Sequence, residues 1–309
     1  MSNYSRRNFL KSIGGLSGAA LLSESFDFKE RRPLLSFSTL GCPDWAYPDI
    51  VSFAAVNGYN GIELRGLQRD LDLPKCKAFN TPGNINASAK LAKEKGIKII
   101  ALGSSAQLHH SEAKERMKNL DEAKRFIDLA HKLNCPFVRV FPNNFPKETA
   151  HDVTIELISK GLEELGNYAK GAKVSVLMET HGDVVWSADI EKIMKMVQSP
   201  DTGLVWDIYN MWSVTKEPPA AVYEILKKYI RHSHIKDAKT IDGTEHYVLP
   251  GKGDSPIFEG IEALSKGGYR GYYSFEWEKM WHPEIDAPEL VLPGYPKVMR
   301  DFFNNKKTN

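Results

Sequence analysis

Short apolar runs recur along the chain about every 30 residues, and this alternation is the feature that most constrains the fold. Several runs are continuously apolar instead of alternating with polar residues. This is typical of β-strands that are covered on both faces in a parallel sheet. The strand candidates are 34–40, 61–64, 97–102, 137–141, 174–179, 203–208, 230–235 and 271–276.

The segments between these runs carry helical patterns. Apolar residues recur near a 3.6-residue period in 111–134 and again in 149–171. Eight strands that each precede a helix predict an α/β fold, a (β/α)8 TIM barrel that forms a single domain over residues 33–305. Shorter helices fit 47–57, 87–95, 188–197, 220–229, 258–265 and 295–304.

Four side chains that can bind metal stand at the ends of four successive strand candidates: Glu179, Asp207, His234 and Glu276. The carboxyl ends of barrel strands meet on one face, so these side chains would lie close together there. Long segments at 66–85 and 238–256 also follow strand ends, and as loops they would overhang the same face.

Three carboxylates and one imidazole suit a hard or borderline divalent ion, namely Mn²⁺, Co²⁺, Mg²⁺ or Zn²⁺. A purely structural zinc site would favour thiolates, and the chain has no Cys-x-x-Cys pair. Any one of these residues alone would be an unremarkable polar residue at the barrel mouth. Their occurrence at four successive strand ends favours a metal site.

The sequence around these positions resembles the xylose isomerase-like TIM barrels, the sugar phosphate isomerase/epimerase superfamily, over about residues 34–305. The resemblance implies that Glu179, Asp207, His234 and Glu276 are the metal ligands. The motifs that carry it are GIELR (61–65), METHGD (178–183), VWDIYN (205–210), HSHIKDA (232–238), LPGKGD (249–254) and YYSFEWE (272–278).

The same resemblance implies a metal-dependent sugar isomerase or epimerase. Glu179 and Glu276 would be the catalytic bases, which take and return a proton next to a carbonyl through a metal-stabilised enediolate. Further residues in or beside the motifs are candidates for substrate binding: His181, Asn210, His232, Lys236, Glu63 and Arg139.

Some of these candidates have an equally plausible structural role. Lys236 would bind a hydroxyl or phosphate group, or pair with Asp237. Trp45, Trp277 and Trp281 would offer a sugar ring an apolar platform or pack in the core.

The chain departs from the family's ketose 3-epimerases at two positions. Several of those enzymes have a histidine where this chain has Asn210, and an asparagine is expected where it has Thr180. An amide hydrogen-bonds a hydroxyl group but does not shuttle a proton near neutral pH. The departures therefore argue against simple 3-epimerisation of a free ketose.

Residues 5–11 (SRRNFLK) and the weakly apolar segment 13–22 closely resemble a twin-arginine export signal. We therefore expect residues 1–32 to be a signal segment and linker, and the protein to be periplasmic. No clear cleavage motif follows, so a membrane tether through an uncleaved signal stays open. Sugar phosphates are mostly intracellular, so the location favours a non-phosphorylated sugar or keto-sugar.

Charge and cysteine content exclude some functions. The formal net charge is +2, and Arg6, Arg7 and Lys11 of the signal region account for the excess, so the remaining body is near neutral and predicts no nucleic-acid partner. No apolar run approaches the roughly 20 residues of a membrane helix. Three cysteines argue against a disulfide framework, although a bridge between Cys42 and Cys76 stays open.

Three other functions fit parts of the pattern. A 3-keto-glycoside lyase would use the same metal site and end in β-elimination. A non-catalytic periplasmic sugar-binding protein would keep the barrel. The related apurinic endonucleases need a multi-zinc cluster and a basic face, which the near-neutral body does not offer. In every favoured case the partner is a small carbohydrate, and a homo-oligomer is common in the family.

Overall fold

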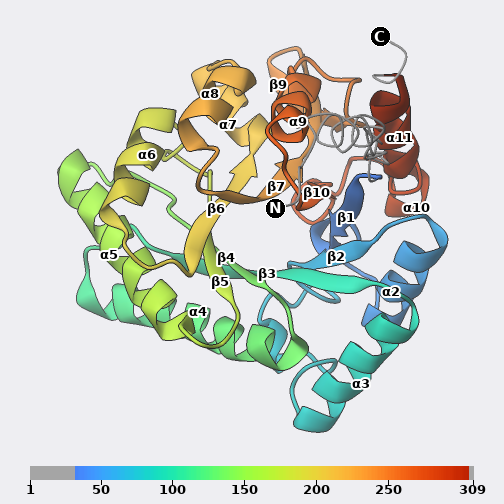
Figure 1. Cartoon of the computed structure of the whole chain (residues 1–309), viewed down its shortest axis with the longest axis horizontal. Coiled ribbons are helices and arrows are strands. Elements are labelled where there is room, and N and C mark those ends of the chain that lie inside the picture. Colours follow the sequence, from blue (N-terminus) through green and yellow to red (C-terminus); the bar gives the residue numbers. More distant parts are fainter. Residues whose placement is uncertain (1–31, 306–309) are drawn as a thin grey trace, which may run out of the picture. The chain divides into compact units, whose positions relative to one another are not determined.

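The structure is a computed structural model that describes residues 32–305. Eight parallel strands close into a barrel in the order β1-β10-β7-β6-β5-β4-β3-β2, which confirms the predicted (β/α)8 fold (Figure 1). The strands are β1 (Leu34–Ser38), β2 (Gly61–Leu64), β3 (Lys98–Gln107), β4 (Phe137–Phe141), β5 (Ser175–Glu179), β6 (Thr202–Asp207), β7 (Ile230–Ile235) and β10 (Tyr272–Phe275).

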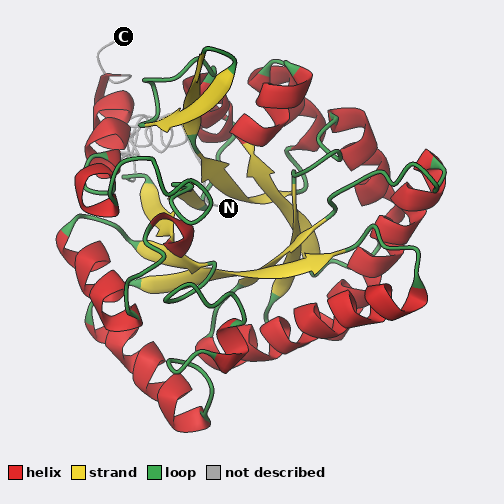
Figure 2. Ribbon diagram, turned by 180° about the vertical axis from the view of Figure 1, so that it is seen from behind, coloured by secondary structure: helices red, strands yellow, loops and turns green. Residues whose placement is uncertain are grey.

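Helices surround the barrel strands (Figure 2). Each main helix buries one stripe against the sheet, as Leu120, Ala123 and Ile127 of α4 do. The elements are α2 (Tyr47–Val56), α3 (Pro82–Glu94), α4 (Ala113–Leu133), α5 (His151–Ala169), α6 (Ser187–Met196), α7 (Ile208–Thr215), α8 (Pro219–Leu226), α9 (Ile257–Lys266), α10 (Pro288–Val291) and α11 (Tyr295–Asn305), with short 3-10 turns η1 (Thr39–Gly41) and η2 (Leu73–Lys75).

Two segments predicted as loops contain regular structure. Helix α3 begins at Pro82, inside the predicted loop, because the Thr81 hydroxyl accepts the amide N–H of Asn84 and caps the helix. The predicted loop 238–256 contains most of an antiparallel hairpin of β8 (Asp237–Ile241) and β9 (Thr244–Val248). Its turn needs positive φ at Asp242 and Gly243, and both residues tolerate that conformation.

The base of the hairpin is held by a buried carboxylate. Asp237 accepts the amide N–H groups of Gly251 and Gly253, both at 2.9 Å, and the hydroxyl of Ser255 at 2.6 Å. A Cβ on Gly253 would lie 2.1 Å from Asp237 Oδ1, so the close approach requires glycine. The LPGKGD motif therefore ties the end of the loop that follows β7 back to the start of that loop at Asp237.

Within the described residues, the structure shows the state of the cysteines and whether a helix could span a membrane. Cys42, Cys76 and Cys135 are buried free thiols, so no bridge joins Cys42 and Cys76. Among the helices of residues 32–305, none is long and apolar enough to cross a membrane. The predicted export signal lies outside the described residues.

Candidate metal centre

Four buried side chains from neighbouring strands converge at the carboxyl end of the barrel. Glu179 ends β5, Asp207 ends β6, His234 lies near the end of β7, and Glu276 follows β10. One ligand atom from each lies within 4.8 Å of the other three. The strand register pairs Asp207 with His234, which sets this level of the barrel. The structure thus brings together all four residues predicted as metal ligands.

A cation holds the outer oxygen of each glutamate. Arg139 Nε lies 3.0 Å from Glu179 Oε2, and both side chains are buried. Lys236 Nζ donates to Glu276 Oε2 at 2.8 Å and to Glu278 Oε1 at 2.7 Å. The inner oxygen of each glutamate is therefore turned toward the centre of the cluster.

The aspartate and the histidine complete this inner face. Asp207 Oδ1 accepts the amide N–H of Asn210 at 2.8 Å and so caps α7. His234 Nδ1 lies 3.3 Å from Glu276 Oε1 and 3.8 Å from both Glu179 Oε1 and Asp207 Oδ2. These four atoms form the candidate ligand set.

Glu63 orients the histidine from across the barrel. His234 Nε2 lies 3.0 Å from both carboxylate oxygens of Glu63, which also contacts His232 Nε2 at 2.9 Å and accepts the Ser274 hydroxyl at 3.1 Å. A carboxylate accepts hydrogen bonds, so His234 Nε2 carries a proton, and Nδ1 is the nitrogen that would bind an ion after losing its own proton. Such carboxylate–histidine pairs are typical supports of metal-bound histidines.

The electrostatics of the cluster are those of a site built for a cation. Burial opposes the charge on His234, but the facing carboxylates Glu276 and Glu63 hold its pKa well above the usual value. Burial raises the pKa of Asp207 to about 7, with Glu276 adding to the effect and Lys236 opposing it. Burial also opposes ionisation of Glu276, yet His234 and Lys236 keep its pKa well below the usual value.

A divalent ion fits the residues present. Asp207 Oδ2 and His234 Nδ1 are buried and make no well-formed hydrogen bond, although Lys236 Nζ lies 2.9 Å from the oxygen and Glu276 Oε1 lies 3.3 Å from the nitrogen. A bound cation would satisfy both. Three carboxylate oxygens and one imidazole nitrogen form the mixed donor set that suits Mn²⁺, Co²⁺, Mg²⁺ or Zn²⁺.

Two of the predicted substrate-binding residues lie beside the cluster. Asn210 Nδ2 approaches Glu179 Oε1 at 3.5 Å, which puts an amide donor next to the proposed ligand. The His181 ring packs at 4.4 Å on Phe141, and its Nδ1 lies 3.0 Å from Asn143 Oδ1.

The other candidates contact the proposed metal ligands and hold them in position. Glu63 and His232 are fully buried and support His234, while Arg139 pairs with Glu179. Lys236 pairs with Asp207, Glu276 and Glu278, and not with Asp237.

Thr180 has a structural role at the position where an asparagine was expected. Its hydroxyl accepts the amide N–H of Asp207 at 2.9 Å and donates to the Asp207 carbonyl at 3.2 Å. It therefore locks the ends of β5 and β6 together.

Two residues at the site were not identified from the sequence. Glu278 shares Lys236 with Glu276, and Arg65 follows β2 at the same end of the barrel. The repeated acid in FEWE and the arginine in GIELR were the available signals.

The three tryptophans considered as sugar platforms differ in exposure. Trp277 is buried and donates from Nε1 to the Asp286 carbonyl, so it packs in the core. Trp45 donates to Glu289 from its indole nitrogen. Trp281 is half exposed and is therefore the one of the three with a large open surface.

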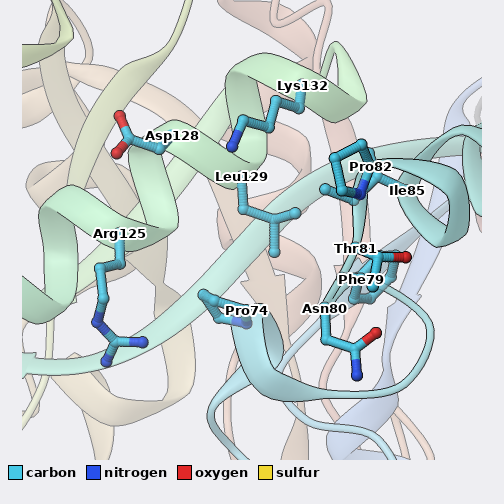
Figure 3. Close-up of a pocket in the computed structure, with 10 residues that line it drawn as sticks. All are labelled: Pro74, Phe79, Asn80, Thr81, Pro82, Ile85, Arg125, Asp128, Leu129 and Lys132. Atoms are coloured by element: carbon cyan, nitrogen blue, oxygen red, sulfur yellow. The ribbon is translucent and has the colours of Figure 1, made fainter.

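A separate groove of about 260 Å³ lies outside the barrel, between the segment around η2 and α3 on one side and α4 on the other (Figure 3). None of the predicted site residues lines it. Its lining is mixed apolar and polar, without a cluster of metal-binding groups: Pro74, Phe79, Asn80, Thr81, Pro82, Ile85, Arg125, Asp128, Leu129 and Lys132.

The fold and the buried cluster define a (β/α)8 barrel with a carboxylate–histidine site at its carboxyl end. The model of the xylose isomerase-like TIM barrel family matches residues 51–293, so the chain belongs to this family. This confirms the family that the motifs indicated. The search of curated proteins gives no match.

Solved structures with the same fold cover nearly the whole barrel. The IOLI protein with a bound zinc atom shares 18% identity and a TM-score of 0.72, over 88% of this chain and 97% of that one. The 3-keto-D-glucoside 4-epimerase YcjR from E. coli shares 16% identity with a TM-score of 0.68, over 87% of this chain and 100% of that one. The probable 3-DHS dehydratase AsbF from Bacillus anthracis shares 18% identity with a TM-score of 0.70, over 86% of this chain and 98% of that one.

Proposed function

We propose that this protein is a metal-dependent sugar isomerase or epimerase that acts on a non-phosphorylated sugar or keto-sugar. The observation that carries the proposal is the set of four buried ligand atoms within 4.8 Å of one another, from three carboxylates and one histidine. The names of similar structures point the same way, because they include a 3-keto-glucoside epimerase and a D-psicose 3-epimerase.

Glu179 and Glu276 are the proposed proton carriers. Burial opposes their ionisation, but nearby cations outweigh it and lower the pKa of both, so both are ionised at neutral pH and accept protons. They come from β5 and β10, with His234 of β7 between them in the barrel order. Two bases on separate strands allow a proton to leave one face of a carbon and return to another.

The bound ion would polarise a substrate carbonyl and acidify the neighbouring C–H group. The chain supplies the rest. Glu63 fixes His234, while Lys236 and Arg139 hold the outer oxygens of the two glutamates. Asn210 and His181 offer hydrogen-bonding groups to substrate hydroxyls.

A second candidate is a 3-keto-glycoside lyase, which we also derive from this site. Lys236 donates at 2.8 Å to Glu276, which puts an acid next to the proposed base. After proton removal, such an acid would protonate a departing alkoxide, and the reaction would then end in β-elimination. One of the similar structures is a probable dehydratase.

The proposed location is the periplasm. The support is the resemblance of residues 5–22 to a twin-arginine signal, with a tether through that signal as the variant form. Fractionation of cells for the full-length chain and for Arg6→Lys/Arg7→Lys tests it. Retention of both forms in the cytoplasm would contradict export.

The test of function begins with metal content. Plasma mass spectrometry should find about one divalent ion per chain in the wild type. The ion should be lost in His234→Ala and kept in Glu284→Gln, an exposed acid outside the cluster. Proton exchange is then followed by NMR in deuterated water, with methyl 3-keto-β-D-glucoside and free ketoses.

Deuterium incorporation with an intact glycoside supports an isomerase or epimerase, and release of methanol supports the lyase. A metal-free wild type after reconstitution, or the absence of exchange on every sugar, contradicts both.

A further inference from the structure

We propose that Arg65 is a specificity-determining residue that binds a carboxylate of the substrate, so that the substrate is an acidic sugar of the uronate class. The inference rests on the proposed function and deepens it, because it names a group on the sugar that the metal ligands do not select.

Arg65 stands at the reacting end of the barrel. It directly follows β2, and its backbone N–H donates to the Thr39 hydroxyl at 2.9 Å, which joins the ends of β1 and β2. The residue is only 5% exposed. It lines a small cavity with Leu40 and Met280, which follow β1 and β10. The Arg65 side chain is therefore buried at this end of the barrel.

The guanidinium is incompletely bonded. Its Nη2 donates to the Ser105 hydroxyl at 3.1 Å, while Nη1 is buried and has no partner. In the described part of the chain, no carboxylate pairs with Arg65 within 4.0 Å, whereas the neighbouring Arg139 pairs with Glu179 at 3.0 Å. A buried charge without a close counter-ion is destabilising, so an unpaired buried guanidinium at this end of the barrel indicates a ligand.

The space around Arg65 is kept open for two guanidinium groups. A Cβ on Gly103 of β3 would lie 2.7 Å from Arg65 Cδ and 2.8 Å from Arg139 Nη2, so glycine makes room for both arginines. Phe141 lies 3.8 Å from the Arg139 guanidinium and 6.0 Å from that of Arg65. Two adjacent cations favour an anionic group over a neutral hydroxyl.

The local field supports an anion. Burial lowers the pKa of Arg65 to about 9, and the like charge of Arg139 adds to the effect, while Glu179 and Glu276 offset it only in part. A divalent ion at Glu179 and Glu276 would add further positive charge on this side. Arginine binds carboxylates through two parallel hydrogen bonds, and Nη1 is a free donor.

The cavity beside Arg65 has a volume of about 10 Å³, which is the room of one water molecule. A carboxylate therefore needs a small displacement of Met280 or of the segment around it. Met280 lies two residues after Glu278, in the segment that follows β10.

The test compares two ligands that differ only at C6, methyl β-D-glucuronide and methyl β-D-glucoside. Their binding to the metal-loaded full chain is measured by isothermal titration calorimetry. We expect the wild type to bind the glucuronide about tenfold to 100-fold more tightly than the glucoside, which is the range for a hydrogen bond to a charged group. Arg65→Met should remove this preference.

Arg125→Met is the matched control, because Arg125 is exposed, lies outside this cavity and pairs with Asp72 at 2.7 Å. It should keep the preference of the wild type. If Arg65→Met fails to fold or to load metal, Arg65→Lys decides. Lysine keeps the positive charge but cannot make the two parallel hydrogen bonds of a guanidinium, so the preference for the glucuronide must fall several-fold.

Equal binding of the two ligands, a preference that survives in both Arg65 variants, or no glucuronide binding below about 10 mM overturns the proposal. Metal content and deuterium exchange on neutral sugars are measured separately. An intact exchange reaction with no glucuronide preference therefore refutes the role of Arg65 and leaves the proposed function standing.

Discussion

Metal affinity should depend steeply on pH, because the ligand set must lose protons before it binds an ion. Burial and Glu276 raise the pKa of Asp207 to about 7, so below pH 7 a proton competes with the ion for this carboxylate. One competing proton lowers the apparent affinity tenfold for each pH unit, or about 1.4 kcal/mol. Asp207 is half ionised at pH 7 and about one hundredth ionised at pH 5, so its loss over this range is about 50-fold.

His234 adds to this slope. Its pKa lies well above the usual value despite burial, because Glu276 and Glu63 face it, so Nδ1 must also release a proton when the ion binds. The expected total approaches two protons per ion. Calorimetry with Mn²⁺ in two buffers of different ionisation enthalpy counts these protons directly. An affinity that stays constant from pH 5 to pH 7, or release of no proton, would refute the reasoning.

The same pKa shifts decide how Asp207 and His234 change the stability of the metal-free protein with pH. The raised pKa of Asp207 means that the folded state holds a proton more tightly than the unfolded chain does. The stability that Asp207 contributes therefore falls as pH rises from about 4 toward 7. The stability that His234 contributes is present below its unfolded pKa and is lost as pH rises through the folded pKa. A metal ion should consequently raise the melting temperature most above pH 7.

Two further predictions concern residues that support the site. Glu63→Gln should weaken Mn²⁺ binding by about tenfold to 100-fold, because the amide no longer fixes the His234 tautomer. Glu245→Gln on the exposed hairpin should leave the affinity unchanged in the same titration. Gly253→Ala should destabilise the fold by about 1 to 3 kcal/mol in chemical denaturation, because its Cβ would meet Asp237 Oδ1 at 2.1 Å. Gly83→Ala, whose Cβ meets nothing closer than 4.0 Å, should not destabilise the fold. Equal effects of the two substitutions would contradict the close approach of Gly253 to Asp237.

The barrel and its ligand set could be predicted from the sequence because both depend on local pattern. Continuous apolar runs mark strands that are covered on both faces, and their spacing gives the (β/α)8 count. A residue at the carboxyl end of such a strand must face the mouth, so Glu179, Asp207 and Glu276 could be placed together before their contacts were known. The structure brings these residues and His234 within 4.8 Å of one another.

The supporting contacts could not be predicted, because they cross the barrel. Glu63 and His234 are separated by 171 residues and meet only when β2 and β7 are brought to facing sides of the closed barrel. Lys236 precedes Asp237 in the chain, yet it pairs with Glu276 and Glu278, because successive side chains of an extended backbone point to opposite sides.

The sequence by itself determined the fold and the chemical types at the strand ends, since apolar periodicity and residue identity are local properties. The tertiary structure decided which oxygen of each glutamate faces the cluster, which cation holds the other oxygen, and that Arg65 is left with an unpaired nitrogen. These properties follow from barrel closure and strand register, which combine side chains far apart in the sequence in one buried volume.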